Sequence, residues 1–257
     1  EATSVVPTSP AGPLTSPLAS PATTSSPEPS VPPLPDVPLP CRPPAHSVGA
    51  RVVSHGNFKT KTVALTFDDG TNPNNTKQIL RTLVHEKVNA TFFPTGVALE
   101  RFPDVWRAVA KDNFPIANHT YAHGALAGKC FEPQRRELAH AAEVFATLGI
   151  AEQPYMRPPY ELWDETTDAA ASAVGLDAVI LWNVDTSDWE GASAATIRRI
   201  ALNGGKGSII LMHTFPEATA AALPGIIKGF KARGFQFVTI GQMLGIDGPV
   251  PYPPAKS

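Results

Sequence analysis

Several features that mark large classes of protein are missing from this sequence. Its 21 Lys and Arg residues are offset by 23 Asp and Glu, which leaves a formal charge of −2 and no basic excess to bind a nucleic-acid backbone. No apolar stretch reaches the ~18–20 residues of a membrane span, and none forms the hydrophobic core of a signal peptide. No Gly-rich phosphate-binding turn follows the first apolar run, and no H-E-x-x-H metalloprotease helix occurs. We therefore expect no nucleic-acid partner and no transmembrane segment.

Proline, in contrast, is abundant and unevenly distributed. Residues 1–44 hold half of the chain's 28 prolines, among Ser, Thr, Ala, Val and Leu residues that show no periodic apolar face. This composition predicts a disordered, semi-extended linker over residues 1–45, followed by a folded domain over residues 46–257. A Ser/Thr/Pro-rich tail before a compact domain is typical of exported, surface-tethered enzymes, so we expect a secreted or cell-wall-associated protein.

Cysteine is scarce, with two residues, Cys41 and Cys130. In an exported protein two cysteines ordinarily form a disulfide, which would tie the end of the linker to the folded domain. Two free thiols are the alternative.

Apolar runs with strand character alternate with amphipathic helical patterns through the rest of the chain. Strands are expected at 62–67, 89–94, 115–118, 154–160, 177–185, 207–213 and 235–240. Helices are expected at 76–87, 104–112, 133–149, 165–175, 193–202 and 221–234. This alternation predicts an α/β fold with a parallel sheet, and the number of units favours a distorted (β/α) barrel of about seven strands over an open sheet.

Polar clusters stand where the expected strands end. They read DDG, NH, RPPY, VDTSDW and MH, each directly after an apolar run. In a (β/α) barrel the C-terminal ends of the strands form the active face. We therefore expect these clusters to meet on one rim.

One cluster, NHTYAHG, holds two histidines four positions apart, His119 and His123. On a strand this spacing would separate them by ~13 Å, too far for one metal ion. On a helical turn the two side chains come within ~6 Å and can share an ion. The pair is therefore a metal site if the chain turns helically here and a third ligand arrives, and otherwise two unrelated polar residues.

The LTFDDG run offers that third ligand. One of Asp68 and Asp69 could complete a His–His–carboxylate site while the other acts as a general base. The alternative is an ordinary Asp-Gly turn. Either explanation requires the chain to bend at Gly70.

The remaining clusters supply a candidate acid and its supports. His213 ends an apolar strand, and either Asp185 or Asp188 could hold its imidazole, although a lone histidine is often only structural. Arg157 could clamp a carboxylate with two hydrogen bonds, or lie on the surface. Trp189 could belong to the core or could wall a sugar-binding cleft.

Taken in order, TFDDG, HTYAH, RPPY, DTSDW and LMH resemble the five motifs of the polysaccharide deacetylases, the family-4 carbohydrate esterases with a NodB-like domain. The resemblance covers about residues 60–243. It implies a distorted (β/α) barrel that binds one divalent metal ion, commonly Zn²⁺ with Co²⁺ as an alternative. The implied reaction removes acetyl groups from N- or O-acetylated polysaccharides.

The resemblance also assigns roles to individual residues. It implies Asp69, His119 and His123 as metal ligands, Asp68 as the catalytic base, His213 as the catalytic acid, Arg157 and Asp188 as the residues that hold the base and tune the acid, Tyr160 as an oxyanion-binding backbone N–H, and Leu211 and Trp189 as walls of the acetyl pocket. Thr120 matches a residue that braces the histidine loop. Glu161 departs from the family, which often has glycine there, and this difference could reshape one side of the cleft.

The expected protein is thus a monomeric, metal-dependent deacetylase of N-acetylglucosamine polymers, either chitin oligomers or peptidoglycan. Protonation by His213 suits a poor amine leaving group better than an alkoxide. An acetylxylan esterase that uses the same residues is the first alternative. A non-catalytic carbohydrate-binding wall protein is the second.

Overall fold

The computed structural model describes residues 41–45 and 48–246. Most of the linker expected over 1–45 therefore lies outside the described residues. In the described part, nine strands form one sheet in the order β1-β6-β5-β4-β3-β2-β8-β7, and β9 pairs with β2 beside this path. Every ladder between these strands is parallel. The curled parallel sheet confirms the distorted (β/α) barrel.

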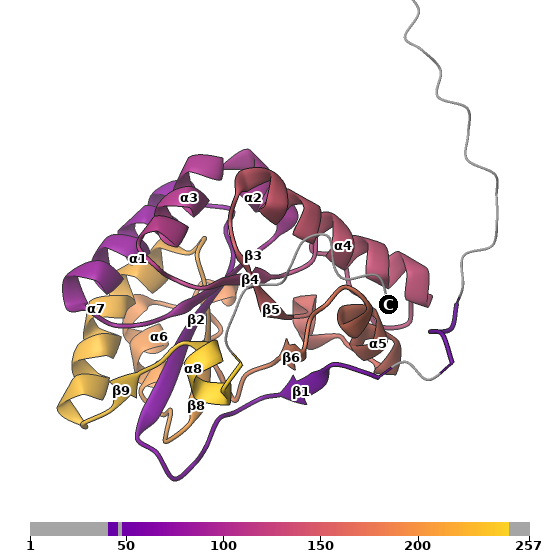
Figure 1. Cartoon of the computed structure of the whole chain (residues 1–257). Coiled ribbons are helices and arrows are strands. Elements are labelled where there is room, and N and C mark those ends of the chain that lie inside the picture. The colour runs from indigo at the N-terminus through magenta and orange to yellow at the C-terminus, as the bar shows by residue number, and fades with distance from the viewer. Residues whose placement is uncertain (1–40, 46–47, 247–257) are drawn as a thin grey trace, which may run out of the picture. The chain divides into compact units, whose positions relative to one another are not determined.

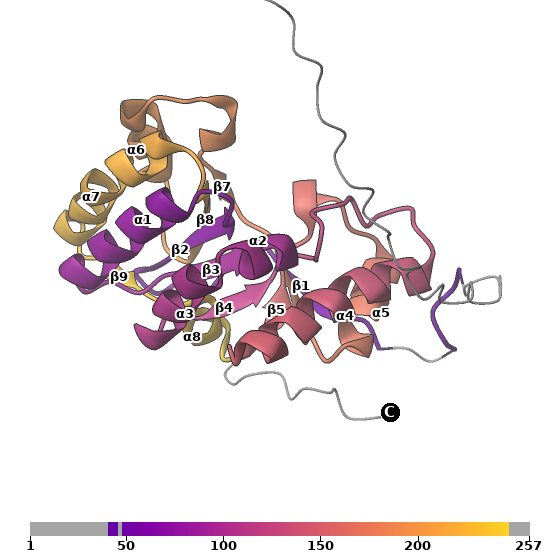
Figure 2. The same cartoon turned by 90° about the horizontal axis from the view of Figure 1, so that it is seen from above.

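The helices form an arc outside the strands (Figure 1) and cover the sheet along its length when seen from above (Figure 2). The strands are β1 (Arg51–Val53), β2 (Thr62–Asp69), β3 (Thr91–Pro94), β4 (Ile116–Asn118), β5 (Glu152–Met156), β6 (Ala178–Ile180), β7 (Val184–Asp185), β8 (Ser208–His213) and β9 (Gln236–Phe237). The α-helices are α1 (Pro73–Glu86), α2 (Gly96–Arg101), α3 (Pro103–Lys111), α4 (Phe131–Leu148), α5 (Glu165–Ala173), α6 (Ala194–Ala201), α7 (Glu217–Ala232) and α8 (Ile240–Leu244).

Local sequence explains where these elements begin and end. The Asn72 side chain accepts a hydrogen bond from the Asn75 backbone N–H and caps α1, with Pro73 in the first helical turn. Helix α4 ends at Gly149 in the left-handed conformation, as its C-terminal glycine predicts. The β2 run is buried on both faces: Val63, Leu65 and Phe67 pack in a cluster with side chains of the outer helices, whereas Ala64 belongs to a second buried cluster made mainly of strand residues.

The single strand expected over 177–185 is wrong. The structure divides it into β6, which pairs with β1 and β5, and β7, which pairs with β8 at the other end of the sheet path. Residues 181–183 join the two: the Leu181 N–H donates to Val53 at 2.8 Å, and the Asn183 N–H donates to Ile209 at 3.3 Å. The apolar run is continuous in sequence, but it crosses the gap between the two ends of the sheet instead of following one strand.

Other differences concern short elements. The strand expected at 235–240 is limited to β9, because Thr239 caps α8 and starts a helix there. The strand expected over 154–160 is β5, which ends before Pro158. Elements β1, α2 and α8 were not predicted, since each is six residues or fewer.

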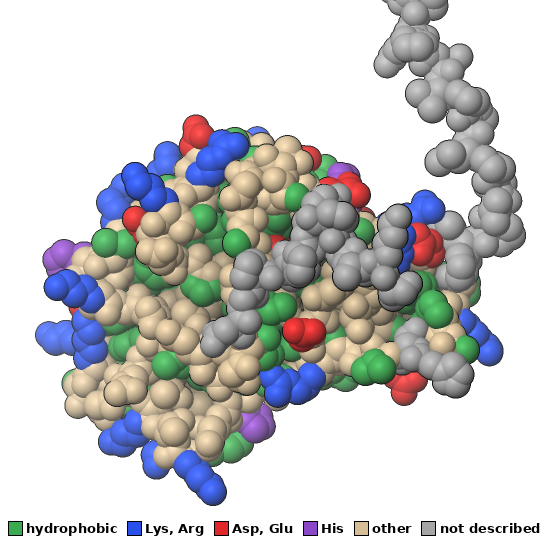
Figure 3. Space-filling view, in the orientation of Figure 1, with side chains coloured by type: hydrophobic (Ala, Val, Ile, Leu, Met, Phe, Trp, Pro, Cys, Tyr) green, Lys and Arg blue, Asp and Glu red, His purple; other side chains and the backbone are tan. Residues whose placement is uncertain are grey.

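The Cys41–Cys130 disulfide expected from the sequence is present. It lies at the start of α4, where the Phe131 N–H also donates to the Cys41 carbonyl at 3.3 Å. None of the helices in the described part of the chain combines the length and the apolar content that a membrane crossing demands. On the face in Figure 3, Lys and Arg side chains are spread around the edge without forming one basic patch.

Candidate active site

The polar clusters meet in a cleft of about 450 Å³ at the C-terminal ends of the strands. Its lining comes from β2, the loops after β4 and β5, and the segments around β7 and β8: Asp68, Asp69, His119, His123, Pro158, Tyr160, Glu161, Trp182, Asp185, Trp189, Leu211, His213 and Phe215. The prediction that residues at five strand ends would share one rim is confirmed for these side chains.

Asp68 and Asp69 both enter the cleft because the backbone turns sharply as β2 ends. Asp69 has a φ of 74° and Gly70 a φ of 87°, so two consecutive residues are left-handed. A Cβ on Gly70 would lie 2.3 Å from the Trp106 ring, which leaves room for glycine alone. The turn is held by Thr214, whose hydroxyl accepts from the Gly70 N–H at 2.8 Å.

The two histidines converge without a helix. Thr120 and His123 have φ values of 63° and 59°, and the His123 N–H donates to the Thr120 hydroxyl at 3.1 Å. This left-handed turn brings the two imidazole centroids to 4.9 Å from each other. The helical turn expected from the spacing is therefore wrong, while the convergence that it was meant to explain is present.

Asp69, His119 and His123 form a candidate metal site. One ligand atom from each lies within 4.8 Å of the others, and Asp69 Oδ1 is 3.4 Å from His119 Nε2 and 3.2 Å from His123 Nε2. Asp69 Oδ1 is buried and has no hydrogen-bond partner among the described residues, and such an atom is costly without a cation. Burial raises the pKa of Asp69, but the two imidazoles outweigh it and lower the pKa. The residues fit one divalent ion.

Contacts outside this candidate site orient its two histidines. His119 Nδ1 lies 2.7 Å from the Arg157 carbonyl, which directs Nε2 toward Asp69. His123 Nδ1 lies 3.1 Å from the Tyr160 hydroxyl. A hydrogen bond on the second ring nitrogen is the usual arrangement for a histidine that binds metal.

Arg157 is fully buried and holds Asp68. Its Nη1 donates to Asp68 Oδ1 at 2.7 Å and to the Thr66 hydroxyl at 2.8 Å. The contact with Asp68 is therefore a single hydrogen bond, and the two-bond clamp considered from the sequence is wrong. The guanidinium carbon lies 4.3 Å from the Phe93 ring centroid, and burial lowers the arginine's pKa although Asp68 offsets part of that effect.

His213, at the end of β8, faces the candidate metal site and is paired with Asp188. Its Nδ1 lies 2.7 Å from Asp188 Oδ1, and its backbone N–H donates to Asp188 Oδ2 at 2.7 Å. Burial of the ring lowers its pKa, but Asp188 and the two aspartates of β2 outweigh burial, so the pKa is raised. Of the two acids considered from the sequence, Asp185 instead accepts from the Ser187 N–H, so the imidazole partner is Asp188.

The expected substrate walls also border the cleft. Leu211 is buried at its floor, whereas Trp189 and Tyr160 are about half exposed or more. Tyr160 and Glu161 are both left-handed, with φ values of 60° and 58°. The position where the family often has glycine thus keeps a glycine-like backbone conformation while carrying a carboxylate.

Several contributing residues were given no individual role from the sequence. Trp182 lines the cleft and packs against Arg157, and Phe215 closes the side next to His213. Asn118, immediately before His119, is buried and accepts from the Thr120 N–H at 2.8 Å. Its amide donates at 2.7 Å to Glu152, a buried acid. The position of Asn118 next to a histidine was an available signal, but nothing near Glu152 in sequence marked it.

Comparisons with known proteins agree with this geometry. The family model described as polysaccharide deacetylase matches residues 55–179. A peptidoglycan-N-acetylglucosamine deacetylase of Bacillus cereus is 36% identical over 195 residues, covering 74% of this chain and 70% of that protein. The peptidoglycan-N-acetylmuramic acid deacetylase PdaC of Bacillus subtilis is 32% identical over 71% of this chain, which spans 38% of PdaC. The crystal structure of the Bc1960 peptidoglycan N-acetylglucosamine deacetylase matches with a TM-score of 0.72 at 33% identity, covering 76% of this chain and 94% of that chain.

Proposed function

This chain belongs to the polysaccharide deacetylase family, and from that premise we propose that it hydrolyses acetyl groups from N-acetylglucosamine units of a polysaccharide, releasing acetate. The substrate is peptidoglycan or a chitin oligomer. The reaction depends on one divalent ion, most simply Zn²⁺, bound by Asp69, His119 and His123. The observation that carries this proposal is the buried Asp69 Oδ1, which has no hydrogen-bond partner among the described residues and lies 3.4 and 3.2 Å from the Nε2 atoms of His119 and His123.

An ion at this site would polarise the acetyl carbonyl and make water more acidic. Arg157 occupies Asp68 Oδ1, while Asp68 Oδ2 lies 3.8 Å from His119 Nε2 and so faces the ligand set. Asp68 is therefore positioned to take the proton of the attacking water as general base. The buried guanidinium keeps a compensating charge beside this carboxylate throughout.

His213 supplies the second proton transfer. Asp188 binds its Nδ1, which leaves Nε2 for the cleft, and the raised pKa keeps the ring protonated to higher pH. An amine leaves only when it is protonated, and the imidazolium is the donor for that step. The Tyr160 backbone N–H binds the developing oxyanion, and Trp189 and Leu211 confine the acetyl group.

The proposed function also includes the domain organisation and the cellular location of the protein. Residues 1–45 are a linker, and residues 46–257 are the catalytic domain of a monomeric enzyme. The Cys41–Cys130 disulfide and the cell-wall polymers named for the relatives support a secreted or wall-associated enzyme.

Acetate release tests the proposal directly. Matched panels of N-acetylglucosamine oligomers, peptidoglycan and acetylated xylan are treated with enzyme, then with chelator, then with added zinc or cobalt. Metal-restored release from the amino sugars supports the proposal. Release from xylan alone would make the protein an esterase, and no release from any panel with metal bound would favour a binding protein.

A His119→Ala variant tests the ligand assignment separately. Loss of one of three ligands should abolish stable metal binding, which metal analysis of the purified protein measures without any substrate. His140→Ala, a surface histidine stacked on Tyr121, is the matched control and should retain the metal. Unchanged metal content in His119→Ala would contradict the assignment.

A further inference from the structure

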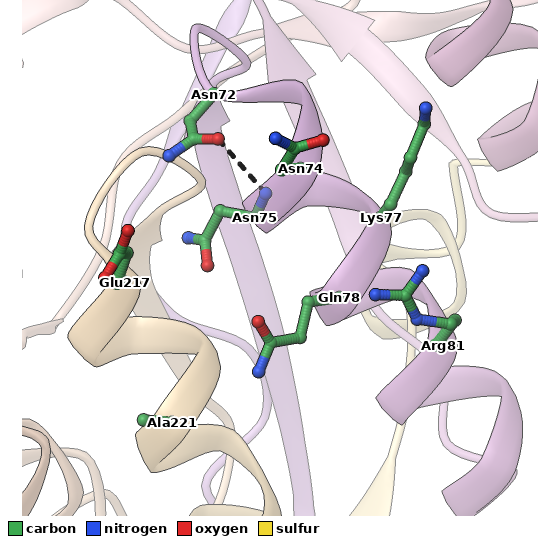
Figure 4. A pocket seen from close by; sticks show the side chains of 8 residues that line it. All are labelled: Asn72, Asn74, Asn75, Lys77, Gln78, Arg81, Glu217 and Ala221. Atoms are coloured by element: carbon green, nitrogen blue, oxygen red, sulfur yellow. Dashed lines mark hydrogen bonds between the residues drawn. The ribbon is translucent and has the colours of Figure 1, made fainter.

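A second hollow lies between α1 and α7 and begins at their N-terminal ends, on the same rim of the barrel as the cleft. It measures about 580 Å³ and is lined by Asn72, Asn74, Asn75, Lys77, Gln78 and Arg81 from α1 and its cap, and by Glu217 and Ala221 from α7. Figure 4 shows Glu217 on one side, Lys77 and Arg81 on the other, and the amides between them. We call this hollow the α1–α7 groove.

The groove shares a wall with the cleft. Asn72 Nδ2 donates to the Phe215 carbonyl at 3.3 Å, and Asn75 Nδ2 donates to the carbonyls of Thr214 and Pro216 at 2.6 and 2.8 Å. Phe215 itself lines the cleft, two residues after His213. The segment 214–216 therefore separates two hollows and is fixed to the groove by three hydrogen bonds. A polymer bound in the cleft would therefore have the polar side chains of the α1–α7 groove next to it.

The groove offers hydrogen-bonding groups that the protein does not use. In the described part of the chain, the side chains of five lining residues make no hydrogen bond or ion pair, namely Asn74, Lys77, Gln78, Arg81 and Glu217. Amide side chains donate and accept at once, as sugar hydroxyl and acetamido groups also do. From residue 74 to residue 81 the helix rises ~10 Å, which gives an extended contact.

The charges of the groove differ from those of the cleft. Lys77 and Arg81 are four residues apart on one face of α1, and such a like-charged pair is mildly unfavourable without an anion. The cleft lining instead contains four acids and, among its described residues, neither Lys nor Arg: Asp68, Asp69, Glu161 and Asp185. An anionic group would be attracted to the Lys77 and Arg81 side of the groove, away from Glu217.

We propose that the α1–α7 groove is a flanking subsite for a carboxylate-bearing sugar of the polysaccharide strand. The amides bind its ring substituents, and Lys77 and Arg81 bind its carboxylate, while a neutral N-acetylglucosamine unit occupies the cleft. This inference rests on the proposed function and narrows its substrate class to strands that alternate neutral and acidic amino sugars, as peptidoglycan does. Chitin has no carboxylate and would use the amides alone.

The test compares two soluble substrates of equal length: peptide-free glycan strands of alternating N-acetylglucosamine and N-acetylmuramic acid, and N-acetylglucosamine oligomers. A Lys77→Gln/Arg81→Gln variant should lose about five- to tenfold in kcat/KM on the glycan strands, through KM, because two exposed charge contacts are removed. On N-acetylglucosamine oligomers kcat and KM should change less than about twofold. An Arg199→Gln/Lys228→Gln variant removes the same charge from exposed positions outside the groove and should behave as wild type.

Binding provides a readout that does not need turnover. In an Asp68→Asn background, calorimetry with the glycan strands should show the same loss of affinity for the groove variant, and the loss should shrink as ionic strength rises from ~0.1 M to ~1 M. Equal affinities for both substrates in wild type and variant would overturn the subsite. An equal loss on both substrates would also overturn it, because it would indicate a structural effect. Wild-type enzyme that binds glycan strands through the groove but releases no acetate would refute the proposed function alone.

Discussion

Two buried carboxylates lie near the histidine loop, and they have different partners. Asp68 receives a hydrogen bond from the buried Arg157 guanidinium at 2.7 Å. Glu152 receives one from the neutral Asn118 amide at 2.7 Å and has no salt bridge among the described residues. Burial raises the pKa of Glu152 to about 7, and the Asn118 hydrogen bond offsets part of that rise. The two acids are about equally buried, but Asp68 has a charged partner and Glu152 has a neutral one.

The difference in partner indicates that Asp68 has a chemical role and Glu152 a structural one. A general base must be ionised at the working pH, and a buried cation favours that state. Glu152 is instead a positioning residue: it orients Asn118, whose carbonyl oxygen accepts from the Thr120 N–H next to His119. Replacing each acid by its amide makes the same chemical change at both positions. The effects on turnover and on stability can therefore be compared directly.

Asp68→Asn should give the largest effect. The amide keeps an acceptor for Arg157 but cannot take a proton, so we expect turnover to fall by about 10²–10⁴-fold with metal content retained. Acetate release and metal analysis on the same preparation measure both. Glu152→Gln is the matched control and should keep turnover within about twofold of wild type. Substantial activity in Asp68→Asn would remove Asp68 from the base role.

Arg157→Met should break the ion pair while keeping an apolar side chain against Phe93. It leaves Asp68 buried without its cation, so the free energy of unfolding near neutral pH should fall by about 3–5 kcal/mol. Urea denaturation followed by fluorescence measures this loss. A loss below about 1 kcal/mol would mean that Asp68 is satisfied by other contacts and that the comparison with Glu152 fails.

Glu152→Gln should change the pH dependence of stability. The pKa of Glu152 is about 7 in the folded state against a usual value of 4.5, so its contribution is complete below pH 4.5 and is lost as pH rises to about 7. Wild type should lose up to about 3 kcal/mol across this window through this group, and the variant should not. The variant should therefore be the more stable protein near pH 8 and equal to wild type near pH 4.

A Glu152→Leu variant completes that experiment. Leucine cannot accept from Asn118, so a buried amide donor is left unsatisfied at every pH, which costs about 1–3 kcal/mol. A pH-independent difference between Glu152→Gln and wild type would refute ionisation as the cause.

Asp68 and Glu152 also differ in whether their roles could be predicted from the sequence. Asp68, His119 and His213 could be predicted because each follows an apolar strand, and the fold brings strand ends to one rim. Glu152 could not, because its role comes from β5 lying beside β4, a pairing of residues far apart in sequence. The break between β6 and β7 was missed for the same reason: the apolar run is uninterrupted, and only the closing of the sheet divides it. The fold class was confirmed, while the catalytic roles remain predictions.

Asp168 extends the series to an acid with neither a cation nor a hydrogen-bond donor on its side chain among the described residues, and it should show the smallest effect. Its Oδ1 is buried without a hydrogen-bond partner among the described residues, and burial, with the charges of Asp164 and Glu165, raises its pKa to about 6. Its stabilising contribution is therefore complete below pH 3.8 and is lost as pH rises to about 6. Because the side chain is only partly buried, solvent screens the penalty, and Asp168→Asn should stabilise the protein by less than about 1 kcal/mol near pH 8. Thermal unfolding at several pH values, with the exposed Asp177→Asn as control, measures the gain; a gain as large near pH 3 as near pH 8 would show that packing, and not charge, is responsible.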